Sequence, residues 1–200
     1  MMFISKTLVI KLKSMDKSYY QITAIDEFSR KRIFEIVDEK SVTNTSRFIK
    51  TLEKKMKLKI NTIQTDNGPE FVNNKLETNL PTLFELTIEK LEMKHRRIRP
   101  YSPWQNEKVE RSHKIDGERF YSRNEFTSVE DLKKKVKRYN TRYNNISKKV
   151  LGFKSPNQIV EEYKLNFLNA KKNYIKRILN LSRLKWMTTS VLTNIIPFYV

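Results

Sequence analysis

The sequence predicts an α/β fold in which a mixed sheet is flanked by helices and followed by a helical C-terminal extension. Three short β-like runs come first and lie close together along the chain. Helical and strand-like patterns then alternate, and only helical patterns follow from about residue 107. Closely spaced strands form antiparallel hairpins, whereas alternating strands and helices form crossover connections. The two patterns together therefore predict a sheet of mixed direction.

The expected strands are short runs rich in β-branched and aromatic residues. The first three, at 7–13, 19–26 and 32–38, should form an antiparallel meander. A fourth run, at 60–65, ends directly before an acidic residue. The fifth begins at His95 and stops at the prolines that follow it, because proline has no backbone N–H for strand pairing.

The expected helices show apolar residues at helical spacing. The first spans 41–57, with Ser41 as its N-cap, and the second spans 80–93, with Pro81 in its first turn. Three more are expected at 107–123, 128–145 and 155–163. We therefore expect a core at 1–122, a helical extension at 123–163, and a tail at 164–200 to which the sequence assigns no role.

The chain is strongly basic, with 41 Lys and Arg against 22 Asp and Glu in 200 residues, a formal net charge of +19. This excess favours a polyanionic partner such as DNA, because each neutralised phosphate releases condensed counterions. The sequence has no cysteine, which excludes disulfides, thiolate zinc sites and cysteine nucleophiles. We see no signal peptide, and the apolar stretch at 186–200 is shorter than the roughly 20 residues of a membrane span. We therefore expect a cytoplasmic protein, nucleoid-associated when bound to DNA, without a membrane partner.

A candidate catalytic acid, Asp66, follows the fourth strand, where open α/β sheets place their ligands. Asn67 and Gly68 behind it permit a sharp turn with positive φ. A second acid, Glu110, lies on an early turn of the next long helix, and the single helix and strand between them can return the chain beside Asp66. Two carboxylates could then share Mg²⁺ or Mn²⁺. The alternatives are an ordinary turn at Asp66 and a surface glutamate at Glu110.

Basic residues surround these acids in the sequence: Arg96, Arg97, Arg99, Lys108, Arg111 and Lys114. We expect them to contact DNA phosphates, although a solvated charged face would look the same in sequence. Tyr101 and Trp104 are interleaved among them and could stack on exposed bases. For Trp104, packing in the core or in a loop is the favoured interpretation.

Three segments, "AIDEFSR", "IQTDNGPEF" and "HRRIRPYSPWQNEKVERSH", resemble in order the core blocks of DDE transposases and retroviral-type integrases. The resemblance covers residues 1–160 and is closest to bacterial insertion-sequence transposases. It implies an RNase H-like fold and a multimer that performs DNA integration and transposition. In such a family three carboxylates bind two divalent ions for DNA strand cleavage and transfer. By position, Asp66 resembles the second carboxylate and Glu110 the third, while Asn67 and Gly68 resemble the turn that presents Asp66.

The first carboxylate of the family pattern has no counterpart in this sequence. Aligned with that pattern, the acid falls just ahead of Met1, which implies an N-terminally truncated and inactive copy as one alternative. Asp26 and Asp16 are conceivable substitute metal ligands, and Asp26 is the better placed of the two. Three functions remain open: a metal-dependent transposase or integrase core, a non-catalytic DNA-binding remnant of one, and an RNase H-like nuclease.

Overall fold

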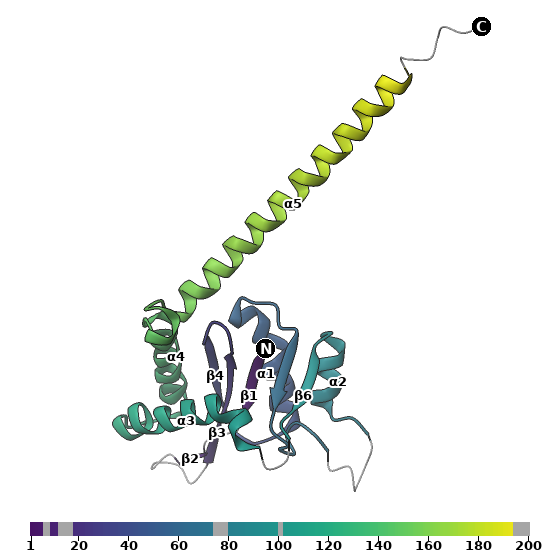
Figure 1. Ribbon diagram of the computed structural model, residues 1–200. Coiled ribbons are helices and arrows are strands. Elements are labelled where there is room, and N and C mark those ends of the chain that lie inside the picture. The colour runs from purple at the N-terminus through teal and green to yellow at the C-terminus, as the bar shows by residue number, and fades with distance from the viewer. Residues whose placement is uncertain (6–8, 12–17, 74–79, 100–101, 194–200) are drawn as a thin grey trace, which may run out of the picture. The chain divides into compact units, whose positions relative to one another are not determined.

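A six-stranded sheet forms the centre of the computed structural model, which describes residues 1–5, 9–11, 18–73, 80–99 and 102–193 (Figure 1). Its strands are β1 (Met2–Ser5), β2 (Val9–Lys11), β3 (Ser18–Asp26), β4 (Arg32–Val37), β5 (Thr62–Thr65) and β6 (Lys94–Arg97).

The sheet has mixed direction, as the sequence predicted. Strands β2, β3 and β4 form an antiparallel meander, in which β4 pairs with one edge of β3 while β1 and β2 share the other edge. Strand β1 is antiparallel to β3 but parallel to β5, which is in turn parallel to β6. Of the strand expected at 7–13, the described part, residues 9–11, is β2, and the other residues of that range lie outside the described residues. The run-by-run interpretation of the sequence did not predict β1 before it, because its four residues show no clear alternation.

Helices cover both faces of the sheet, and the alternation of side chains along β1 shows the two sides. Met2 and Ile4 are buried with α1 (Val42–Met56) and α2 (Leu83–Lys90). Phe3, pointing the other way, is buried with Val109. The second face is therefore covered by helices of the later half of the unit, α3 (Glu107–Arg119) and α4 (Val129–Asn145), which gives three layers (Figure 1).

The starts of α1 and α2 show one correct and one wrong prediction from the local sequence. The side chain of Ser41 accepts a hydrogen bond from the Asn44 backbone N–H and caps α1, as predicted. The expectation that Pro81 opens the next helix is wrong. Thr82 is the N-cap of α2 and forms a reciprocal capping box with Glu85, and this arrangement leaves Pro81 outside the helix.

The C-terminal helices also differ from the expected ranges. The run predicted at 107–123 breaks at the buried Phe120, after which a short 3₁₀ turn, η2 (Tyr121–Arg123), follows. The helix predicted at 155–163 continues through most of the unassigned tail, as α5 (Pro156–Thr193), since neither glycine nor proline interrupts it.

The chain divides into two compact units, residues 1–160 and 161–200. The first holds the sheet together with α1 to α4, and α5 begins at its end and supplies the described part of the second. None of the helices among the described residues combines the length and apolar character of a membrane-spanning segment.

Candidate active site

Asp66 directly follows β5 and holds its two carboxylate oxygens in different environments. Oδ1 accepts a hydrogen bond from the Gly68 N–H at 3.1 Å. Oδ2 is buried and has no hydrogen-bond partner among the described residues. A buried carboxylate oxygen without a donor is unfavourable, and carboxylate oxygen is the ligand that Mg²⁺ and Mn²⁺ prefer. The arrangement therefore fits a carboxylate that is held by one oxygen and keeps the other for a cation.

The turn after Asp66 is built differently from the sequence-based expectation. Neither Asn67 nor Gly68 has a positive φ, so that part of the prediction is wrong. An added Cβ at position 68 would lie 2.5 Å from Oε2 of the buried Glu70, so any larger residue there requires the Glu70 carboxylate to move. The Asn67 side chain donates to the Ile98 carbonyl at 3.3 Å and ties the turn to the chain after β6.

Glu110 lies on α3 with its side chain exposed, one residue after the buried Val109 that fixes this end of the helix to the sheet. Gln64, two residues before Asp66, donates to the backbone carbonyl of Gln105 at 2.9 Å. This hydrogen bond joins the end of β5 to the turn that leads into α3. It brings the segments carrying the two predicted acids, Asp66 and Glu110, to one region of the molecule.

In the part of the chain that the structure describes, no group of three or more His, Cys, Asp or Glu residues could hold a metal ion. Met2 and Phe3 of β1 pair with Ile63 and Gln64 of the parallel β5, so continuing this register places Ser5 level with Asp66. Met1 lies at the other end of β1. The family sequence pattern places the first acid just ahead of Met1. The strand register instead puts Ser5, at the opposite end of β1, level with Asp66.

Asp26, the substitute considered above, has another role in the structure. Its Oδ2 accepts hydrogen bonds from both the backbone N–H and the hydroxyl of Ser29, at 2.8 and 2.7 Å. These bonds stabilise the turn between β3 and β4, so the geometry of Asp26 is explained without a metal ion. Asp16 lies outside the described residues.

The predicted DNA-contacting residues fall into two groups. Five of them have exposed side chains: Arg96, Arg97, Arg99, Arg111 and Lys114. Lys108 instead forms an ion pair with Glu27, and its ammonium lies 5.2 Å from the centre of the Phe3 ring.

Packing of Trp104 in the core or in a loop was expected, and the structure excludes the core. Trp104 lies in the 3₁₀ turn η1 (Pro103–Asn106) with 68% of its surface exposed. An exposed indole beside basic residues can stack on a nucleic-acid base. Tyr101 lies outside the described residues.

His95 supports the strand end that carries Asp66. Its Nε2 lies 2.8 Å from the hydroxyl of Thr65, which donates in turn to the Asp66 backbone carbonyl. Burial lowers the pKa of His95, with nearby Glu85 opposing the shift and Arg97 adding to it. The neutral imidazole is thus the favoured form beside the candidate acid.

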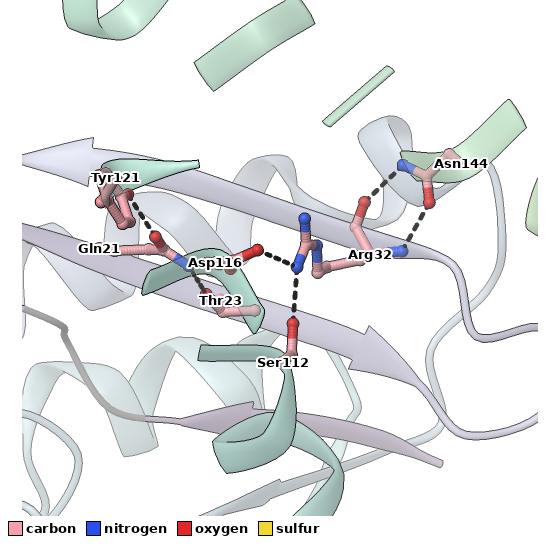
Figure 2. Close-up of polar contacts among 7 residues, drawn as sticks. All are labelled: Gln21, Thr23, Arg32, Ser112, Asp116, Tyr121 and Asn144. Carbon is pink, nitrogen blue, oxygen red and sulfur yellow. Dashed lines mark hydrogen bonds and ion pairs between the residues drawn. The ribbon is translucent and has the colours of Figure 1, made fainter. Parts of the chain in front are cut away.

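Behind α3 lies a buried polar network that the sequence did not reveal (Figure 2). Nη1 of the fully buried Arg32 donates to Asp116 Oδ1 at 2.7 Å and to the Ser112 hydroxyl at 2.6 Å. Gln21 donates to the other oxygen of Asp116 at 3.0 Å, and Asn144 of α4 bonds both backbone groups of Arg32. The network joins β3, β4, α3 and α4. It thereby fixes the helix that carries Glu110.

Comparison with known proteins identifies the family of this chain and agrees with its fold. Two sequence-family models, each described as "Integrase core domain", match residues 5–103 and 91–147 and together span most of the chain. The chain is 29% identical over 167 residues to the protein named "Putative integrase ORF3" of Spiroplasma virus SpV1-C74. That match covers 78% of this chain but only 44% of the viral protein, so the chain spans less than half the length of this relative.

Solved structures show the same fold at low sequence identity. The catalytic core domain of BIV integrase matches with a TM-score of 0.58 at 15% identity, covering 83% of this chain and 97% of that one. A chain of the simian T-cell lymphotropic virus intasome, solved in complex with PP2A regulatory subunit B56 gamma, matches with a TM-score of 0.63 at 17% identity. That match covers 79% of this chain and 53% of the intasome chain. The RNase H-like mixed sheet and the matched family sequences together show that this chain belongs to the integrase core domain family.

Proposed function

We propose that this chain is a transposase or integrase core that cuts and joins DNA strands with the help of a divalent metal ion. The observation that carries the proposal is the free, buried Oδ2 of Asp66 at the end of β5, with Glu110 on the helix joined to that strand end. Its substrates would be transposon ends and target DNA, and strand transfer between two DNA ends favours a multimer.

Each residue of the site would have a distinct task. Asp66 and Glu110 would hold Mg²⁺ or Mn²⁺, which when bound activates a water or a 3′-hydroxyl and stabilises the leaving oxygen. Gly68 N–H keeps the Asp66 carboxylate in one orientation. Lys114 lies one helical turn after Glu110 on the same face, where its ammonium can contact the DNA phosphate next to the carboxylates. The exposed Trp104 offers a ring on which a base displaced from the duplex can stack.

The test compares Asp66→Asn and Glu110→Gln with wild type in nicking and strand transfer of duplex oligonucleotides, with Mg²⁺ or Mn²⁺. Direct Mn²⁺ binding is measured by electron paramagnetic resonance as a readout independent of activity. Loss of a residue that only supports a metal ligand lowers metal affinity by about 10- to 100-fold. Because each variant removes a proposed ligand itself, each should weaken Mn²⁺ binding by more than that. Glu118→Gln removes an exposed acid from the same helix and serves as the control. Equal Mn²⁺ affinity in wild type and both site variants would exclude the proposed site.

A second candidate is a DNA-binding protein without catalysis. It is favoured by the absence, among the described residues, of a three-carboxylate group. This function predicts DNA affinity that depends on salt but is the same with and without Mg²⁺ and unchanged by Asp66→Asn. Nicking activity in wild type that both site substitutions abolish would rule it out.

A further inference from the structure

A basic cavity of about 560 Å³ lies between the end of α3 and α4. Its cationic lining residues are Arg119, Arg123, Lys135, Arg138, Arg142 and Lys148. Its lining contains no aspartate or glutamate, and the rest of its wall includes apolar side chains such as Phe120 and Ile146. The cavity therefore concentrates positive charge in a concave space, an arrangement suited to an anionic ligand.

Most of this charge is not neutralised within the protein. Among the described residues, Lys135 alone of these cationic lining residues has a carboxylate partner, Asp131, at 2.7 Å. Within the described parts of the chain, the guanidinium groups of Arg119, Arg123, Arg138 and Arg142 form no ion pair with a carboxylate. Four arginines that line one cavity without a counter-charge repel each other, so an anion bound among them would be stabilised.

A further cation lies behind the wall of the cavity. The ring of Tyr143 lies 3.9 Å from the guanidinium carbon of Arg32 and 3.6 Å from the ammonium of Lys148. Nε and Nη2 of Arg32 are buried and have no hydrogen-bond partner among the described residues. Burial, and next the charge of Arg32, lower the pKa of Lys148. Lys148 therefore lies in surroundings that disfavour its positive charge, and a bound phosphate would reverse that effect.

The basic cavity is separate from the candidate active site. Arg119 follows Glu110 by nine residues on α3, or about two and a half helical turns. The two side chains therefore leave opposite sides of the helix, about 14 Å apart along its axis. A DNA segment in contact with Glu110 therefore meets the side of α3 opposite to the one on which Arg119 lines the cavity.

We propose that the basic cavity binds the phosphate backbone of a second DNA segment, distinct from the segment at Asp66 and Glu110. The inference rests on the proposed function, since joining two DNAs requires both to be held at once. Arg119 and Arg123 come from one wall and Arg138 and Arg142 from the other, so both walls offer planar guanidinium groups that bind phosphate through two hydrogen bonds. The positive charge continues outside the cavity along α4, at Lys133, Lys134 and Lys137, and this favours a long polyanion over a small one.

The first experiment measures the salt dependence of DNA binding by fluorescence anisotropy, without metal. The variant Arg138→Ala/Arg142→Ala removes two phosphate contacts from the cavity, and Lys50→Ala/Lys54→Ala removes the same charge from α1, which covers the other face of the sheet. Two lost contacts should lower the slope of log K against log[salt] by about 1.8. Between about 50 and 200 mM salt, wild type should then lose affinity about 12-fold more than the cavity variant does. Equal slopes for the two double variants would overturn the inference.

The second experiment counts DNA segments by titration with duplexes of about one helical turn. Wild type should saturate at two duplexes per chain, and either Arg138→Ala/Arg142→Ala or Arg97→Ala/Arg99→Ala should reduce this to one. Saturation of wild type at one duplex would refute a second DNA site. Binding of inorganic triphosphate in the cavity that duplex DNA does not displace would refute it as well.

Both experiments remain informative if the proposed chemistry fails. If wild type shows no nicking activity but binds two duplexes, and if the cavity variant has the lower salt slope, the catalytic function is refuted. The second DNA site then still stands. Circular dichroism checks the fold of each variant, and Arg119→Gln/Arg123→Gln, on the opposite wall, replaces the α4 variant if that one unfolds.

Discussion

Replacing Asp116 by asparagine should strongly destabilise the first unit. The side chains of Arg32 and Asp116 are both completely buried, and no other carboxylate bonds this guanidinium group among the described residues. At a charge separation of about 4 Å and an effective dielectric constant of about 20, their attraction is about 4 kcal/mol. Measured costs of removing one partner from a buried pair are about 3–5 kcal/mol, because the other charge stays buried alone.

Such a loss is a large part of the roughly 5–15 kcal/mol by which a domain is stable. We therefore expect Asp116→Asn to lower the free energy of unfolding by about 3–5 kcal/mol and Tm by about 6–20 °C for a unit of this size. Urea and thermal denaturation, followed by circular dichroism, measure both quantities. The double variant Arg32→Met/Asp116→Leu, which removes both charges, should recover most of the loss.

The control is Glu35→Gln, which removes a charge from the exposed Glu35–Lys55 ion pair on the same strand as Arg32. Exposed pairs are screened by water, so this variant should lose at most about 1 kcal/mol. If Asp116→Asn is no less stable than Glu35→Gln, the buried pair does not hold α3 against the sheet as we argue.

Three further predictions concern stability and test His95, Gly68 and Thr82. Because burial lowers the pKa of His95, the unfolded chain binds a proton there more readily than the folded one, so stability should be complete above about pH 6.5 and decrease as the pH falls below it. Urea titrations at several pH values should show a shallower decrease for His95→Gln, and parallel curves would contradict the assignment. Gly68→Ala should cost about 1–3 kcal/mol, since its Cβ collides with the carboxylate of Glu70, and Glu70→Ala in the same chain should recover part of this. Additive losses in the double variant would show that the two side chains do not meet. Thr82→Ala should cost about 1–2 kcal/mol in urea denaturation by removing the cap of α2, whereas Thr82→Ser, which keeps the hydroxyl, should cost clearly less.

The sequence predicted those parts of the site that depend on neighbouring residues. Asp66 stands at the end of a recognisable strand, and Ser41 caps the helix that it directly precedes. The pairing of Arg32 with Asp116 could not be predicted in this way, because 84 positions separate them and each resembles a surface charge in sequence. The exposure of Trp104 was not predicted either, because a tryptophan is usually well buried and its neighbours in the sequence do not show that it lies on the surface.

Asn144 has a consequence for self-association. Its side chain accepts from the backbone N–H of Arg32 at 2.9 Å and donates to the backbone carbonyl at 2.6 Å, so it occupies the groups that a foreign strand would pair with at the start of edge strand β4. The opposite edge strand, β6, carries Lys94, Arg96 and Arg97, whose like charges oppose pairing with a copy of itself. These features of β4 and β6 oppose the addition of a further strand at either place. We expect a multimer of this chain to form through its helices in preference to β4 or β6.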